Sequence, residues 1–161
     1  MNAIEMLKQQ HREVEALFAQ FKKAKSAGPQ RKIFEQIADA LAVHAPIEEK
    51  HFYPSVKKKA TEDLLLESLE EHLEIKRVIA DLLVLDAKDP TFEAKVTVLE
   101  EDVQHHVGEE EKELFPKVEK LFDEEMLEAV AEAMEETRDE LLEDGNPREA
   151  IPSETETAPH L

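Results

Sequence analysis

The chain has 161 residues, which is enough for one domain with a substantial core, and the absence of cysteine excludes disulfides and thiolate metal sites. Its 39 acidic and 20 basic residues give a formal net charge of −19, which argues against nucleic acid or an anionic membrane as partner. Neither a signal peptide nor an apolar run long enough to span a bilayer is present, so the expected location is the cytoplasm.

Apolar residues recur at helical spacing, while three glycines and 5% aromatic residues give strands and hairpins little support, so we predict an all-α fold. The first helix is predicted over residues 2–25, with Asn2 as its N-cap. The second is predicted over residues 31–58. Pro46 and Pro54 lie inside it, so we expect local bends and a helix end near Pro54.

Two more long helices are predicted over residues 62–85 and 92–121, and Thr61 is the expected N-cap of the former. A shorter fifth helix follows and is expected to dock on the outside of the other four. The last residues are rich in Pro, Ser, Thr and Glu, which is typical of a disordered tail. The expected units are a four-helix bundle over 1–121, an additional helix within 122–143, and a tail over 144–161.

A repeat joins the second and fourth predicted helices. In residues 44–54 and 106–116 a His is followed four residues later by a Glu and then by an aromatic-Pro pair, and the copies align without a gap. Each copy is preceded by a further His, 33 residues before His44 and 34 before His106. Since i and i+4 share a helix face, each hairpin offers one His and then a His-Glu pair.

Helix rises place the four histidines near one level of the bundle. Counting about 1.5 Å per residue returns His11 and His44 to one height, and does the same for His72 and His106. The step from the second to the third helix leaves about 6 Å that depends on where those helices end. All four histidines lie on apolar stripes, and two core-facing carboxylates need cations or hydrogen bonds, so we predict a metal centre. The alternative is a metal-free acidic scaffold with structural histidines.

Six protein ligands suit two metals better than one. With Glu48 and Glu110 as bridges, each metal receives two His and two carboxylate oxygens. An oxo or hydroxo bridge then leaves about one open position per metal, as expected for chemistry on small molecules. The ligand types allow iron, manganese or zinc.

The two His-x-x-x-Glu motifs with their preceding histidines and the trailing Phe-Pro resemble the hemerythrin-like, or HHE cation-binding, proteins over about residues 3–120. The resemblance implies an up-down-up-down four-helix bundle with two non-haem irons. Members bind or react with O₂, peroxide or nitric oxide, or sense iron. Oxygen-carrying members have a fifth His where this chain has Lys76, which argues against reversible O₂ carriage. The implied iron ligands are His11, His44, Glu48, His72, His106 and Glu110.

Four further side chains lie near this set in the sequence. Lys76 and His51 are candidate proton donors, and His51 is expected to lie outside the ligand set. Glu15 is expected to pair with Lys76, with a ligand role as the alternative. Tyr53 lies about half a turn from His44 on an undistorted helix, so a packing role is favoured unless the helix bends sharply.

The favoured function is that of a di-iron protein reacting with O₂ or peroxide, and catalase-like peroxide decomposition is the form of enzyme activity considered. The alternative is iron, O₂ or nitric-oxide binding without turnover, as a store, carrier or sensor. The sequence leaves the physiological oxidant, the electron donor and the choice between monomer and dimer open.

Overall fold

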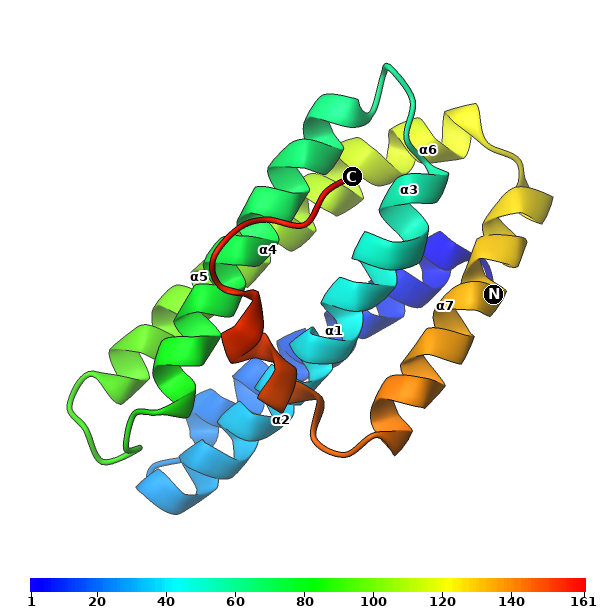
Figure 1. Cartoon of the computed structure of the whole chain (residues 1–161). Coiled ribbons are helices and arrows are strands. Elements are labelled where there is room, and N and C mark those ends of the chain that lie inside the picture. The colour runs from blue at the N-terminus through cyan, green and yellow to red at the C-terminus, as the bar shows by residue number, and fades with distance from the viewer.

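The computed structural model describes all residues from 1 to 161, which form helices and their connections without a β-strand. Two π-helical turns, η1 and η2, interrupt the second and fourth long helices, and η3 is a 3₁₀ helix near the C-terminus (Figure 1). The elements are α1 (Ala3–Lys23), α2 (Ala27–Ile47), η1 (Glu48–Phe52), α3 (Tyr53–Ser55), α4 (Glu62–Leu83), α5 (Phe92–Glu109), η2 (Glu110–Leu114), α6 (Phe115–Leu121), α7 (Glu124–Glu143) and η3 (Pro147–Glu154).

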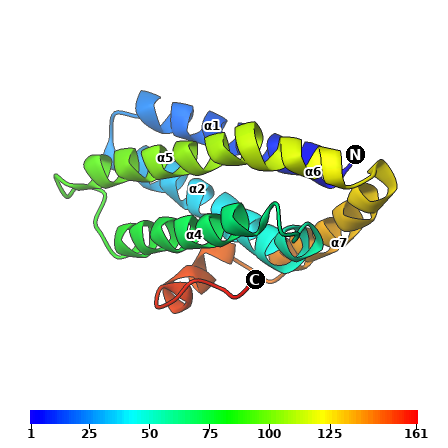
Figure 2. The same cartoon turned by 90° about the horizontal axis from the view of Figure 1, so that it is seen from above.

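The long helices α1, α2, α4 and α5 run in alternating directions side by side, which confirms the predicted all-α bundle (Figures 1 and 2). Helix α7 packs against α1, α2 and η1 at one end of the bundle (Figure 1). None of the helices combines the length and apolar character needed to cross a membrane.

Helix starts follow local sequence chemistry, with two departures from the prediction. The Asn2 side chain accepts a hydrogen bond from the Glu5 amide at 3.0 Å, as expected of an N-cap. Helix α2 begins at Ala27, four residues earlier than predicted, because Pro29 lies in the first turn, where its missing N–H breaks no bond. Thr61 precedes α4, but its hydroxyl donates to the Val56 carbonyl at 2.7 Å instead of capping the helix.

The apolar core consists of two clusters with a polar layer between them. Toward the α7 end, one cluster includes Leu7 and Leu69. Toward the opposite end, the other includes Val14 and Ile75. On α4 the buried His72 lies between Leu69 and Ile75, and the other long helices repeat this order. The core is therefore built around a buried layer of histidines and glutamates.

The C-terminal segment differs from the predicted disordered tail. Helix η3 packs against α2 and α4 (Figure 2), and Ile151 is buried among apolar residues of the second cluster. Arg148 donates to Asp39 at 2.8 Å, and Arg77 donates to the Thr155 carbonyl at 2.9 Å. One buried isoleucine and two arginine contacts hold a segment whose overall composition is polar. Composition averages over the segment and therefore misses these anchors.

Candidate metal centre

The structure brings the six predicted ligand residues together in the polar layer. Each of the four long helical rods contributes one buried His, and η1 and η2 begin with the two glutamates. All six side chains are buried, with exposed fractions between 0% and 6%. The residues that meet are His11, His44, Glu48, His72, His106 and Glu110.

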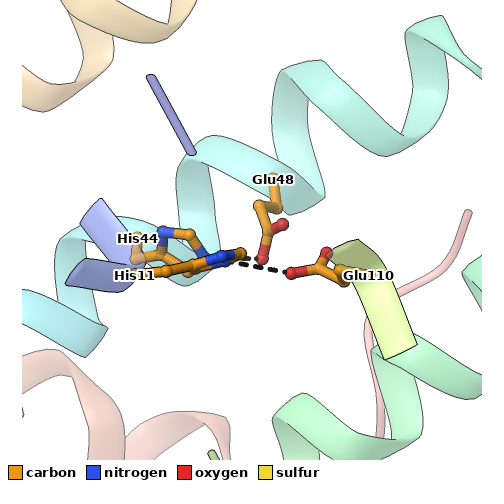
Figure 3. A group of neighbouring side chains, drawn as sticks. All are labelled: His11, His44, Glu48 and Glu110. Carbon is orange, nitrogen blue, oxygen red and sulfur yellow. Dashed lines mark ion pairs between the residues drawn. The ribbon is translucent and has the colours of Figure 1, made fainter. Parts of the chain in front are cut away.

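One half of the cluster, called here the first position, is formed by His11 and His44 with both glutamates (Figure 3). His11 Nε2 lies 3.2 Å from Glu110 Oε1, and His44 Nε2 lies 2.9 Å from Glu48 Oε1. The two imidazole rings are 5.0 Å apart between centroids. Two nitrogens and two carboxylates from four chain segments thus face one point.

The other half, called the second position, is formed by His72 and His106 with Glu48. His72 Nε2 lies 3.1 Å from Glu48 Oε1 and 3.1 Å from His106 Nε2. His106 Nε2 lies 3.3 Å from Glu110 Oε1 and 3.7 Å from Glu48 Oε1. Glu48 is therefore shared by the two positions, as the predicted bridging role requires.

The outer nitrogen of every cluster imidazole is held by a side chain outside the cluster. Each Nδ1 lies 2.7 or 2.8 Å from a carboxylate or amide oxygen. An Nδ1–H donated outward leaves the Nε2 lone pair facing inward, which is the tautomer that binds a metal. The pairs are His11 with Glu111, His44 with Gln10, His72 with Glu49, and His106 with Glu71.

Four buried polar atoms of the cluster make no well-formed hydrogen bond, although His11 Nε2 and His44 Nε2 lie 3.2 and 2.9 Å from carboxylate oxygens. The four atoms are His11 Nε2, His44 Nε2, Glu48 Oε2 and Glu110 Oε1. An unpaired buried polar atom costs about 1–3 kcal/mol, so folded proteins rarely keep several at one point. Imidazole nitrogens and carboxylate oxygens are ligands for divalent transition metals, and cations between them would satisfy all four atoms. The residues present therefore fit a metal centre.

Opposite charges within the cluster raise the pKa values of its histidines and lower that of Glu48, so both kinds of group favour their ionised forms. Burial disfavours the charged form of His106, but the carboxylates of Glu110 and Glu48 outweigh this effect and hold the pKa of His106 well above the usual value. The pKa values of His11 and His72 are raised as well, although burial opposes this. Burial also opposes the ionisation of Glu48, but neighbouring imidazoles hold its pKa well below the usual range. The cluster thus attracts cations, and without metal it holds protons.

The Tyr53 ring packs in the apolar core, as favoured, but its hydroxyl also reaches the buried histidines and glutamates, which was expected only for a sharp bend. Its hydroxyl is fully buried, donates to Glu110 Oε2 at 2.7 Å and lies 3.3 Å from His72 Nε2. Burial, together with the charges of Glu110 and Glu48, raises the pKa of Tyr53 well above its usual value, so the phenol keeps its proton.

The π-helical turn explains why the undistorted helix misplaced Tyr53. The Tyr53 amide bonds to the Glu48 carbonyl, five residues back, and the wider turn rotates the phenol toward the cluster. Pro54 supplies the signal, since a proline lacks the N–H of an α-helical bond and its ring clashes with the carbonyl four residues back. The second copy has the same turn, and its Phe115 ring stacks on His11 at 6.0 Å.

The other candidates lie outside the cluster. Lys76 is buried, and its Nζ lies 3.0 Å from a Glu49 oxygen. His51 Nε2 lies 2.6 Å from Thr137 Oγ1 on α7, so its ring contacts a helix outside the four-helix bundle. Glu15 is exposed and contacts Arg12 at 3.3 Å, so the expected pairing with Lys76 does not occur.

A small cavity of about 40 Å³ adjoins the cluster. All four histidines contribute to its walls, and the remaining lining is mostly apolar. Lys76 lies in the wall, and η3 closes the outer side with Ile151 and Glu154. The cavity has room for a molecule of a few atoms beside the imidazoles, and its lining favours an uncharged one.

Comparison with known proteins identifies the family. The model of the hemerythrin HHE cation-binding domain matches residues 2–118. A crystal structure of an HHE cation-binding domain-containing protein from Mycobacterium kansasii has a TM-score of 0.80 at 23% identity, covering 96% of this chain and 99% of that one. A protein named DNA nickase from Nostoc sp. is 29% identical over 118 residues, which are 73% of this chain but 34% of that protein. The chain, with its buried cluster of histidines and glutamates, belongs to the hemerythrin HHE cation-binding domain family.

Proposed function

We propose that this protein is a non-haem di-iron protein that reacts with peroxide or O₂. The observation that carries the proposal is the convergence of buried imidazole nitrogens and carboxylate oxygens, four of which have no other partner. The proposed ligands are the six residues of the cluster: His11, His44, Glu48, His72, His106 and Glu110.

The arrangement of these residues supports a proposal of two cations rather than one. The cluster consists of two groups of ligand atoms that share Glu48, and each group has two imidazoles. With four imidazoles and two carboxylates, the cluster suits iron in its ferrous and ferric states. Iron held this way supplies electron transfer to and from O₂ or peroxide.

The residues around the cluster suit a reaction with a small oxidant. The 40 Å³ cavity limits the size of the molecule that reaches the imidazoles, and burial of the cluster excludes bulk water. Tyr53 holds a proton on its hydroxyl 2.7 Å from Glu110, so it is better placed as a proton donor than His51, whose ring contacts α7. Lys76, in the cavity wall, remains a candidate donor. Peroxide disproportionation into O₂ and water also needs no outside electron donor.

Peroxide turnover tests the proposed reaction. Iron-loaded protein is expected to evolve O₂ from hydrogen peroxide, measured with an oxygen electrode, and His72→Ala is expected to lose this activity while circular dichroism reports an intact fold. The matched control is His160→Ala, because His160 is exposed near the C-terminus and is not among the cluster residues or their Nδ1 partners. Equal turnover by His72→Ala and the native protein would contradict the proposal.

Binding without turnover is the second candidate, and the apolar lining of the cavity favours it, because O₂ and nitric oxide are essentially apolar whereas hydrogen peroxide needs hydrogen-bond partners. Iron-loaded protein that binds nitric oxide but evolves no O₂ from peroxide would favour a sensor, carrier or store. Neither proposed function includes the DNA nickase activity for which the Nostoc relative is named. A net charge of −19 repels DNA phosphates, and the chain spans about a third of that relative.

A further inference from the structure

The contacts to the four Nδ1 atoms follow the internal repeat. The residue before the first His of each hairpin contacts the second His of the same hairpin: Gln10 reaches His44, and Glu71 reaches His106. The residue after each cluster Glu contacts the first His of the other hairpin, with Glu49 reaching His72 and Glu111 reaching His11. The pattern is symmetric except at one point. Gln10 is an amide where its counterpart, Glu71, is a carboxylate.

An amide and a carboxylate act differently on an imidazole. A carboxylate only accepts hydrogen bonds, so it fixes the proton on Nδ1 and its negative charge makes Nε2 a better electron donor to a metal. A glutamine is neutral and presents either an acceptor or a donor, so it neither adds charge nor excludes the tautomer with the proton on Nε2. His44 is therefore held more weakly in its metal-binding form than the other three histidines.

Neighbouring cations do not remove this difference. Each of the three carboxylates has one basic partner on its other side: Arg12 beside Glu111, Lys76 beside Glu49, and His105 beside Glu71. These partners differ in strength, from the buried Lys76 to the exposed His105, but each leaves a carboxylate at Nδ1, so the neutral side chain of Gln10 is the main asymmetry among the Nδ1 partners. Glu110 does not add a second one, because its Oε1 lies 3.2 Å from His11 Nε2 and 3.3 Å from His106 Nε2. At the second position a carboxylate contacts Nδ1 of both histidines, whereas at the first position a carboxylate contacts Nδ1 of His11 alone.

We infer that the two metal positions are unequal, and that Gln10 makes the first position, at His11 and His44, the weaker one. This inference rests on the proposed di-iron function and adds an order of loading to it. The second position fills first, so the protein passes through a state with one metal per chain. Gln10 is a positioning residue that acts through His44, since its contact is with Nδ1.

The test is an anaerobic titration of metal-free protein with Fe²⁺ in competition with a chromophoric chelator. The native protein is expected to bind iron in two steps that differ in affinity by about tenfold or more, the usual effect of a partner to a ligating histidine. Gln10→Glu is expected to tighten the weaker step about tenfold, and Glu71→Gln to weaken the tighter step by about 10- to 100-fold. A gain of affinity from Gln10→Glu is not expected of a merely structural residue.

Gln9→Glu is the matched control, because it adds the same charge one residue away on the exposed surface of α1. The inference is overturned if the native protein binds two Fe²⁺ with equal affinity, or if Gln9→Glu and Gln10→Glu have the same effect. In either case, a native protein that binds two iron ions remains consistent with the proposed di-iron function. Failure of the native protein to bind Fe²⁺ at all contradicts the proposed function itself.

Discussion

At the scale of single residues, Tyr53 is the group whose chemistry is easiest to isolate. Its hydroxyl donates to Glu110 Oε2 inside the cluster, and the repeat supplies a phenylalanine at the corresponding position, Phe115. We expect Tyr53→Phe to keep its iron but to lower peroxide turnover by about 100-fold, the typical contribution of a positioned proton donor. Iron analysis and an oxygen electrode measure the two quantities. Native turnover by an iron-replete variant would rule out a role for the phenol.

Lys76 offers a prediction about stability. It is 5% exposed and pairs with Glu49, whose carboxylate also holds His72. Removing one partner of a buried ion pair leaves the other charge uncompensated, so Lys76→Met is expected to cost about 3–5 kcal/mol in urea unfolding of the metal-free protein. Lys22→Met is the control, since Lys22 pairs with Glu100 at the surface and its loss is expected to cost under about 1 kcal/mol. Equal losses from the two variants would contradict the account.

That these histidines and glutamates meet in one buried cluster was predictable from the sequence, whereas their outer partners were not, for a physical reason. His44 and Glu48 share a helix face at i and i+4, a local relation that holds in any helix. Which carboxylate reaches a given Nδ1 depends on how helices pack, and the chain has 39 acidic residues to choose from. Glu49 and Glu71 therefore became distinguishable from other surface acids only in the folded structure.

At the scale of elements, the two π-helical turns set the shape of the centre. Each begins at a cluster glutamate and is followed by a residue and then a proline, Pro54 in the first copy and Pro116 in the second. The turn explains how Tyr53 enters the cluster, which the α-helical period does not allow. It also accounts for the contact of the Tyr53 hydroxyl that the undistorted helix did not predict.

Replacing the proline tests this explanation. Pro54→Ala restores the missing N–H and is expected to favour an α-helical turn that rotates Tyr53 away from Glu110. The chain has one tyrosine, so tyrosinate absorption reports on this residue alone. Its pKa is raised well above the usual value by burial and nearby carboxylates, and it should fall toward the usual value in the variant. Pro116→Ala, in the other copy, should leave the titration unchanged; equal shifts in both variants would refute the explanation.

The observed helix ends explain why counting the helical rise per residue did not bring His44 and His72 to the same height. Eleven residues separate His44 from the end of α3 at Ser55, and ten separate the start of α4 at Glu62 from His72. The predicted end at residue 58 was too late, and this error accounts for most of the missing 6 Å, about 1.5 Å for each misassigned residue. Helix ends depend on caps and turns that the apolar period does not report.

At the scale of the whole molecule, a polar layer divides the core into two apolar clusters, and η3 covers the cavity beside that layer. The four-helix arrangement was predictable because the helical period and the repeat act along the entire bundle. The position of η3 was not, because it depends on contacts between Ile151 and residues far away in the sequence. One buried side chain in a polar segment leaves almost no periodic signal.

The covering role of η3 leads to a prediction about access to the centre. Ile151→Ala removes the apolar side chain that closes the cavity and is expected to destabilise the protein by about 2–5 kcal/mol. It should also speed the removal of iron by a chelator, followed by absorption. Ala150→Gly is the control, because Ala150 is the exposed neighbour of Ile151 in η3. Unchanged chelation kinetics in Ile151→Ala would show that η3 does not limit access.

If the buried cluster is a two-metal iron centre, as proposed, the purified protein should contain the corresponding amount of iron. The measurement is iron per chain after anaerobic reconstitution and removal of loosely bound metal, for the native protein and for Glu48→Ala, which lacks the shared carboxylate. We expect about two iron ions per native chain and a large loss in the variant. Native protein that retains no iron, or a variant that retains as much as the native protein, would contradict the proposal.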